Sequence, residues 1–156
     1  MGSDSDLEVM QEAARALKLF GITTEMRILS AHRTPEEVSD FAKGAFAEGF
    51  QVLIAGAGGA AHLPGMLAAH TEIPVIGVPV PLGHLKGEDA LLSIVQMPRG
   101  VPVATVAIGN AFNAGILAVQ MIGIADSAVH AQLKQFKADM RSEVQKKDQK
   151  LRKQKI

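Results

Sequence analysis

Four short runs of β-branched and apolar residues constrain the fold of this chain more than any other feature. They cover residues 23–29, 51–55, 75–80 and 101–108. Strands that are apolar on both faces are typical of a parallel sheet covered by helices on each side, whereas half-exposed antiparallel strands alternate apolar and polar residues. We therefore predict four parallel strands in a sheet that is buried on both faces.

The segments between these runs have the periodicity of amphipathic helices. Residues 6–19 and 34–48 each gather apolar side chains on one face, namely Met10, Ala14 and Leu17 in the first and Val38, Phe41 and Phe46 in the second. Further helices are predicted over residues 63–70, 89–96, 113–124 and 127 to about 150. Because strands and helices alternate, we predict an α/β protein in which helices sandwich a parallel sheet.

The length of 156 residues suits a single domain over residues 1–156. Its last part, from about residue 126 to residue 156, is predicted to be a long C-terminal helix. One apolar stripe on this helix would pack either within its own subunit or on a neighbouring subunit, and it consists of Val129, Leu133, Phe136, Met140 and Val144.

The composition argues against several classes of partner. Sixteen basic and sixteen acidic side chains give a net charge of zero, so there is no long-range field to attract nucleic acid or an anionic membrane. The basic residues 146–155 are interleaved with Gln and Asp and lack aromatic rings, which favours a solvated helix end over a nucleic-acid tail. Without cysteine, a signal peptide or a long apolar span, the chain is predicted to be cytoplasmic.

Ligands of open parallel sheets bind beyond the carboxyl ends of the strands, so the loops there are the candidate site. The opening loop, residues 2–6, leads into a helix, and Ser5 and Glu8 have the spacing of a capping box. Its hydroxyl and backbone N–H groups suit a phosphate, although an ordinary helix cap would have the same sequence.

A second loop, residues 30–33, follows the first predicted strand. Thr34 and Glu37 have the spacing of a capping box and predict the start of the next helix. A histidine such as His32 exchanges protons near neutral pH, and the guanidinium of Arg33 can grip a phosphate or carboxylate. The alternative is an ordinary surface pair, but the place at the sheet edge favours a functional one.

A third loop, residues 56–62, is rich in glycine. It nearly matches the dinucleotide fingerprint G-x-G-x-x-A, but residues 75–80 lack the acidic residue that this motif requires, which argues against NAD. The absence of Trp and Tyr argues against a flavin, and the five histidines lack the spacing of metal ligands. We therefore predict no cofactor and no metal, and a small phosphorylated metabolite as the ligand.

Four segments resemble the 5-(carboxyamino)imidazole ribonucleotide mutase (PurE) family, class I, the type of bacteria, plants and fungi. The similarity covers residues 1 to about 125, and its motifs are Met1-Gly2-Ser3-Asp4-Ser5-Asp6, Ser30-Ala31-His32-Arg33-Thr34-Pro35, Gly56-Ala57-Gly58-Gly59-Ala60-Ala61-His62-Leu63-Pro64-Gly65-Met66 and Leu92-Ser93-Ile94-Val95-Gln96-Met97-Pro98. The resemblance implies a flavodoxin-like three-layer α/β/α sandwich and an isomerase of purine biosynthesis.

The resemblance also implies roles for single residues. Ser3 and Arg33 would hold the ribonucleotide phosphate with help from Ser5, and Asp6 would bind the ribose. His32 would move a proton while carbon dioxide migrates from the carbamate nitrogen to C4 of the imidazole. The imidazole and its carboxylate would lie against Ser30, Ala31, Ala57, Gly58, Ala60 and Leu63. A closed apolar pocket would trap the carbon dioxide, with Ala57, Ala60, Ala61, Leu63 and Met97 as its walls.

Members of the family form octamers, so the resemblance implies a homo-octamer. The spacing of residues 109–114 is closer to that of plant and fungal members, which are fused to the ATP-dependent carboxyaminoimidazole ribonucleotide synthase. We thus expect fusion to, or cooperation with, that enzyme. The family has a central strand before the Met-Gly-Ser turn, and we expect that this strand is missing here. Two further hypotheses are a non-catalytic ribonucleotide-binding module and a direct aminoimidazole ribonucleotide carboxylase.

Overall fold

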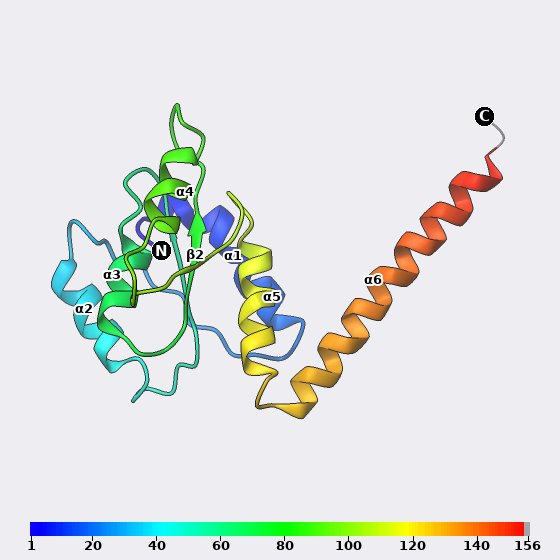
Figure 1. Cartoon of the computed structure of the whole chain (residues 1–156), viewed down its shortest axis with the longest axis horizontal. Helices are drawn as coiled ribbons and strands as arrows, with labels where there is room; N and C mark the ends of the chain where they lie inside the picture. Colours follow the sequence, from blue (N-terminus) through cyan, green and yellow to red (C-terminus); the bar gives the residue numbers. More distant parts are fainter. Residues whose placement is uncertain (155–156) are drawn as a thin grey trace. The chain divides into compact units, whose positions relative to one another are not determined.

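The computed structural model, which describes residues 1–154, contains an open parallel sheet (Figure 1). Its assigned strands are β1 (Leu53–Ala57), β2 (Val75–Pro79) and β3 (Ala104–Thr105), in that order across the sheet. β2 pairs in parallel with both neighbours, with Ala55 opposite Gly77 and Gly77 opposite Thr105. The predicted parallel sheet is therefore confirmed, although β1 starts two residues later than expected.

The prediction of a strand over residues 23–29 is wrong, because no regular strand is assigned to these residues. The Met1 ammonium group donates to the Arg27 carbonyl at 2.9 Å, and the Leu29 N–H donates to the Met1 carbonyl at 2.9 Å. On its other side, the Gly2 N–H donates to the Gly56 carbonyl of β1 at 3.1 Å. Residues 1–2 thus lie between residues 27–29 and β1. A ladder needs a run of paired residues, and this contact is only two residues long.

The last predicted strand, residues 101–108, is regular only at β3. Pro102 has no N–H to donate, and the Val101 N–H bonds locally to the Pro98 carbonyl. Beyond β3 the chain still follows β2, because the Val106 N–H donates to Gly77 at 3.1 Å and the Gly109 N–H donates to Pro79 at 2.9 Å. The strand was thus predicted at the right position in the sequence, but local backbone geometry makes it shorter than residues 101–108.

Helices cover both faces of the sheet, as Figure 1 shows. α1 (Leu7–Lys18) and the start of α5 (Ala111–Ile122) lie on one face, and α2 (Pro35–Gly44), α3 (Leu63–His70) and α4 (Glu88–Val95) lie on the other. A Cβ added at Gly56 would lie 2.2 Å from the Met10 sulfur of α1, and one added at Gly77 would lie 2.4 Å from Ile94 of α4. The predicted three-layer sandwich is confirmed.

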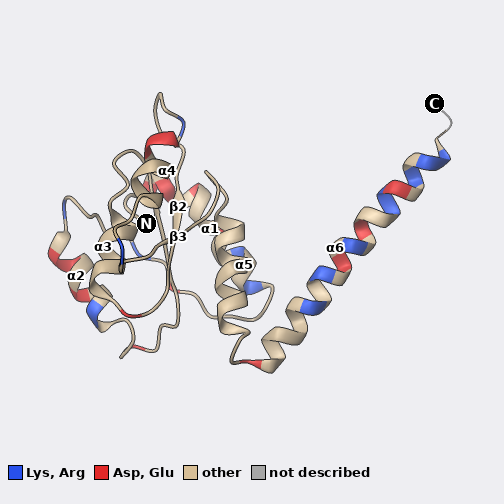
Figure 2. Cartoon of the chain, viewed as in Figure 1, with Lys and Arg blue, Asp and Glu red and all other residues tan. Residues whose placement is uncertain are grey.

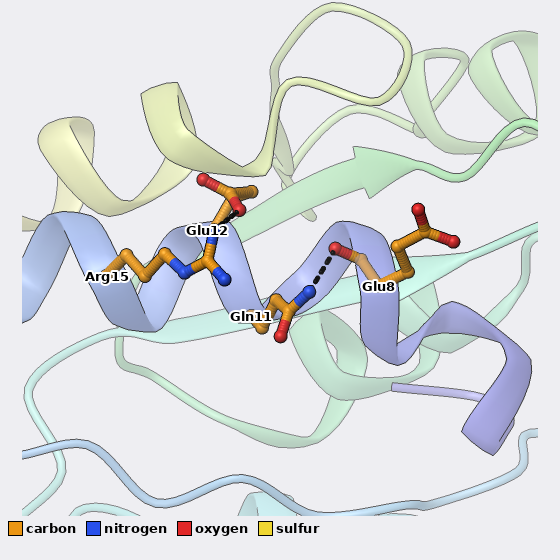
Figure 3. A network of polar contacts seen from close by, with 4 residues as sticks. All are labelled: Glu8, Gln11, Glu12 and Arg15. Carbon is orange, nitrogen blue, oxygen red and sulfur yellow. Dashed lines mark hydrogen bonds and ion pairs between the residues drawn. The ribbon is translucent and has the colours of Figure 1, made fainter.

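The α1 helix shows why these segments are helical. Its apolar residues recur at helical spacing and are buried, namely Met10, Ala13, Ala16 and Leu17. The opposite side carries polar contacts, which Figure 3 shows: Arg15 pairs with Glu12, and the Gln11 amide donates to the Glu8 carbonyl at 3.2 Å. Exposed pairs of this kind stabilise a helix by only about 0.2–0.5 kcal/mol, so burial of the apolar face dominates.

Helix boundaries were predicted to within a few residues, and α3 was predicted at its observed bounds. α2 is the exception, because it ends at Gly44 rather than at residue 48. Phe46, which was assigned to its buried face, lies beyond the helix end and is exposed. Val38 and Ala42 provide the buried face of α2 instead.

The chain consists of two compact units, residues 1–118 and the residues from Val119 on. In the second unit, α6 (Ser127–Lys153) is capped by Asp126, whose carboxylate accepts from the N–H groups of Ala128 and Val129. Charges of both signs alternate along α6 in Figure 2, and Asp148 pairs with Arg152 at 2.9 Å. No helix among residues 1–154 combines the length and the apolar character that a membrane span needs.

Candidate active site

A cleft of about 370 Å³ lies at the carboxyl edge of the sheet, within the first unit. Its lining residues come from four places in the chain, which are the loops within residues 2–6, 30–33 and 57–63, and Leu82 after β2. Because the carboxyl ends of parallel segments meet at one edge, loops that are distant in sequence converge there. The cleft therefore lies where the strand pattern predicted a ligand site.

The opening turn is held by Ser3 and Asp6. The Ser3 N–H donates to the Asp6 carboxylate at 3.1 Å, and the Ser5 N–H donates to the Ser3 hydroxyl at 3.4 Å. The predicted capping box of Ser5 and Glu8 is wrong, because a 3-10 turn, η1 (Asp4–Asp6), precedes α1 and shifts the cap to Ser3. Asp6 is almost fully buried and lines the cleft.

The surroundings of the opening turn also change the pKa of the Met1 amino group. Burial lowers the pKa of this ammonium group, and the nearby Asp6 carboxylate opposes the shift. The Arg27 carbonyl accepts one of its hydrogens. The start of the chain is thus packed among the site segments, beside a buried carboxylate.

The turn from Ser30 to Thr34 is closed by hydrogen bonds of Thr34 to Ser30 and not by the predicted capping box. The Thr34 hydroxyl accepts from the Ser30 N–H at 3.0 Å and donates to the Ser30 carbonyl at 3.2 Å. It makes no cap bond to α2, so the predicted box with Glu37 is wrong. α2 begins at Pro35, whose fixed φ and missing N–H suit a first helical residue.

Arg33 joins the first two site loops. Its Nε donates to the Ser30 hydroxyl at 3.0 Å, and its Nη2 donates to the Gly2 carbonyl at 3.0 Å. A guanidinium has five N–H donors, so the remaining ones are available to an anion. The side chain is exposed and has no carboxylate partner among the ion pairs of residues 1–154. Arg33 with Ser3 and Ser5 forms a polar, cationic end of the cleft.

His32 contacts a second histidine that the sequence reasoning did not select. Its Nε2 lies 2.7 Å from Nδ1 of His62, and the two rings meet edge to face at an interplanar angle of 80°. His62 stands just before α3, at the end of the glycine-rich loop. The sequence did contain a signal for His62, because both histidines lie in loops that were predicted at the same edge of the sheet.

Small and apolar residues form the remaining wall, namely Ala57, Gly58, Ala60, Leu63 and Leu82. A Cβ added at Gly58 would lie 3.0 Å from Cβ of Leu82, so only glycine fits here without a shift. Ala61 and Met97, which were expected in this wall, do not line the cleft. Ala61 is buried in the core, and the Met97 sulfur packs close to Gly65.

Apart from Ala61 and Met97, the cleft brings together the site residues predicted from the sequence, namely Ser3, Ser5, Asp6, Ser30, Ala31, His32, Arg33, Ala57, Gly58, Ala60 and Leu63. It also includes Gly2, His62 and Leu82, which were not predicted. Within residues 1–154, no group of three or more His, Asp or Glu side chains is arranged to hold a metal ion. The arrangement combines a cationic end that has N–H and O–H donors, a buried carboxylate and two histidine rings in contact.

Known proteins with similar sequences share one family. The family model described as AIR carboxylase matches residues 1–143. The N5-carboxyaminoimidazole ribonucleotide mutase of Mycobacterium tuberculosis is 60% identical over 97% of this chain and 87% of its own length. The chloroplastic phosphoribosylaminoimidazole carboxylase of Vigna aconitifolia is 56% identical over 98% of this chain, which matches only 28% of that longer protein.

The fold has a solved counterpart. The crystal structure of Treponema denticola PurE superposes with a TM-score of 0.88 and covers 97% of this chain and 94% of that one, at 30% sequence identity. This similarity supports the α/β sandwich described above.

Proposed function

The chain belongs to the AIR carboxylase family, and on this premise we propose that it is an isomerase of purine biosynthesis that converts 5-carboxyaminoimidazole ribonucleotide to 4-carboxy-5-aminoimidazole ribonucleotide. Relatives named as mutases are 55–60% identical to it over nearly its whole length. The observation that carries the proposal is the cleft, in which a cationic end, a histidine and an apolar wall lie together.

The binding step follows from the cleft's two ends. Arg33, Ser3 and Ser5 provide the N–H and O–H donors that a phosphate dianion needs, and Arg33 is already held in place by Ser30 and Gly2. The buried Asp6 carboxylate accepts hydrogen bonds, which suits the ribose hydroxyls. The base would then extend toward His32, with Ala31 and the small residues of the glycine-rich loop around it.

The chemical step needs one proton-transfer group. As the bond between the carbamate nitrogen and carbon dioxide breaks, the electron pair remains on nitrogen, and His32 donates a proton to that nitrogen. The imidazole C4 then attacks the retained carbon dioxide, and His32 removes the proton from C4. The proton balance is zero over the cycle, and substrate and product are isomers, so the reaction as written uses neither ATP nor a redox partner.

A direct test is the conversion of 5-carboxyaminoimidazole ribonucleotide by the purified protein without ATP. His32→Asn should lower kcat by roughly 10²- to 10⁴-fold, which is the usual contribution of a general acid and base, and should still bind the product in calorimetry. His70→Asn is the control, because His70 ends α3 and bonds the Met66 carbonyl outside the cleft. Full activity in His32→Asn would contradict the mechanism.

The same preparation distinguishes the two alternatives. Binding without turnover would identify a non-catalytic ribonucleotide-binding module. A rate with aminoimidazole ribonucleotide that saturates at low bicarbonate would identify a direct carboxylase. The identity to the mycobacterial mutase favours the mutase over both.

Three further proposals concern the setting of the enzyme. We propose a homo-octamer, which sedimentation velocity would test, and a cytoplasmic location. We also propose that the protein acts next to the ATP-dependent carboxyaminoimidazole ribonucleotide synthase. The match to only 28% of the longer Vigna aconitifolia protein shows that a related sequence also occurs as one part of a longer chain.

A further inference from the structure

Asp4 stands between Ser3 and Ser5, the two serines at the cationic end of the cleft. Its Oδ1 atom accepts a hydrogen bond from the Ser3 hydroxyl at 3.0 Å and a second one from the Ser5 N–H, also at 3.0 Å. The Ser5 N–H lies 3.4 Å from the Ser3 hydroxyl, so its contact with Asp4 is the shorter of the two. A single carboxylate oxygen therefore holds both serines.

The two hydrogens that Asp4 accepts are ones that a phosphate at this end of the cleft would need. A hydroxyl and a backbone N–H each carry a single hydrogen, so a group that donates it to Asp4 has none left for another acceptor. In this conformation, the Ser3 hydroxyl and the Ser5 N–H are thus committed to a carboxylate of the same chain. Arg33 is not, because none of the ion pairs within residues 1–154 joins it to Asp4.

We infer that Asp4 is a built-in competitor for the phosphate-binding end of the cleft and sets how tightly the ribonucleotide binds, an inference that rests on the proposed mutase function. When the phosphate binds, it accepts the hydrogens of the Ser3 hydroxyl and the Ser5 N–H, and the Asp4 carboxylate turns away. The Asp4 side chain is exposed and does not line the cleft, so it can turn into solvent without a movement of the loop.

The opening turn does not depend on the Asp4 side chain. The Ser3 N–H donates to the Asp6 carboxylate at 3.1 Å, and the Asp6 N–H donates to the Ser3 carbonyl at 3.2 Å. These two bonds close the turn between Ser3 and Asp6. Replacing Asp4 should therefore change the competition with phosphate while the turn that carries both serines stays closed.

This competition has a definite kinetic signature. Substrate and product carry the same phosphate, so a competitor that is part of the chain weakens the binding of both by the same factor. A change in such uniform binding alters KM and leaves kcat unchanged. Removing the competitor should thus lower KM alone, whereas damage to the site would raise KM or lower kcat.

Two substitutions separate the competition from the negative charge of Asp4. Asp4→Ala removes both, whereas Asp4→Glu keeps the charge on a longer side chain. Local bonds of this kind to the backbone are typical of the short side chains of Asp and Asn, so the glutamate should lose them. We expect KM for 5-carboxyaminoimidazole ribonucleotide to fall roughly three- to tenfold in both variants, the equivalent of about one net hydrogen bond, with kcat unchanged.

Glu8→Gln is the matched control for charge. Glu8 lies in the first turn of α1, so the substitution also removes one negative charge close to the opening turn. Its side chain neither lines the cleft nor bonds Ser3 or Ser5. KM should therefore stay within about twofold of the wild-type value, because the competitor is still in place.

Ribose 5-phosphate provides a readout that does not depend on turnover. Its dissociation constant, measured by calorimetry, should fall in Asp4→Ala and Asp4→Glu by the same factor as KM, and it should be unchanged in Glu8→Gln. If the wild type does not convert the substrate, the proposed function fails instead. The titrations would still decide whether Asp4 competes with the phosphate.

Three results would overturn the inference. Unchanged KM and dissociation constants in both Asp4 variants would mean that the carboxylate does not compete with the phosphate. A fall in Asp4→Ala alone would mean that Asp4 acts only through its charge. Failure of ribose 5-phosphate to bind the wild type and every variant would mean that this end of the cleft does not hold a phosphate.

Discussion

The Thr34 hydroxyl shapes the site although Thr34 does not line the cleft. It bonds both the N–H and the carbonyl of Ser30, four residues before it, and so closes the turn that carries His32 and Arg33. The sequence predicted that the same hydroxyl would cap α2. Both arrangements are local, and the choice between them depends on how the turn meets the rest of the sheet edge.

Thr34→Val should separate the hydroxyl from the shape of the side chain. Loss of the acceptor leaves the half-buried Ser30 N–H without its partner, so the free energy of unfolding should fall by about 1 kcal/mol. Because Ser30 also binds Arg33, KM should rise several-fold. Urea denaturation and steady-state kinetics measure the two effects. Thr34→Ser, which keeps the hydroxyl, should resemble the wild type, and equal behaviour of the two variants would contradict the turn-locking role.

Arg33→Lys tests the cationic end of the cleft. A lysine keeps the positive charge, but its single ammonium group cannot bond Ser30 and Gly2 and also make two parallel hydrogen bonds to a phosphate. KM should rise roughly tenfold, which corresponds to about 1.4 kcal/mol, with little change in kcat. Inorganic phosphate should also inhibit the variant more weakly than the wild type. A fall in kcat at constant KM would place Arg33 in the chemical step instead.

At the scale of elements, helices were easier to predict from the sequence than strands. Helix bounds depend on neighbours in the chain, such as Pro35 at the start of α2, and α3 was predicted at its observed bounds. A strand exists only if a partner lies beside it. Among residues 1–154, residues 27–29 pair only with Met1, and the strand predicted over residues 101–108 is shortened by local geometry near Pro102. The apolar pattern of these two segments could not reveal how few of their residues are paired.

Gly77→Ala tests the contact between β2 and α4. A Cβ at this position would lie 2.4 Å from Ile94 and 2.9 Å from Val103, so the sheet and helix would have to move apart. The free energy of unfolding should fall by about 1–3 kcal/mol, the usual cost of overpacking a core. Gly44→Ala in α2 is a matched control, because its Cβ would meet only the Glu48 carboxylate at 3.4 Å. That variant should be as stable as the wild type or more stable, and thermal denaturation would show whether the two differ.

At the scale of the whole molecule, the sheet edge explains why most of the cleft could be predicted. Loops that follow parallel segments converge, so the Ser-, His- and Gly-containing loops were the right candidates. Leu82 was missed because it lies in an apolar stretch after β2 with no motif of its own, and Met97 was wrongly included because it packs on Gly65 instead. Which apolar residues face a ligand is a property of the assembled fold.

The cleft wall formed by Leu82 leads to a prediction about the migrating carbon dioxide. Leu82 is 54% exposed, yet it lines the cleft and lies against Gly58 of the glycine-rich loop. If it excludes water and retains the gas, Leu82→Ser should let part of the carbon dioxide escape after decarboxylation. Aminoimidazole ribonucleotide would then appear as a side product above the enzyme-free background.

The ratio of aminoimidazole ribonucleotide to carboxylated product, measured by chromatography, is the relevant quantity because it does not depend on enzyme concentration. Leu85→Ser is the matched control, since Leu85 is similarly exposed in the same loop but does not line the cleft. We expect the ratio to rise in Leu82→Ser alone. An unchanged ratio at a lowered rate would mean that Leu82 acts only in binding, because a leaking pocket must divide its intermediate between two products.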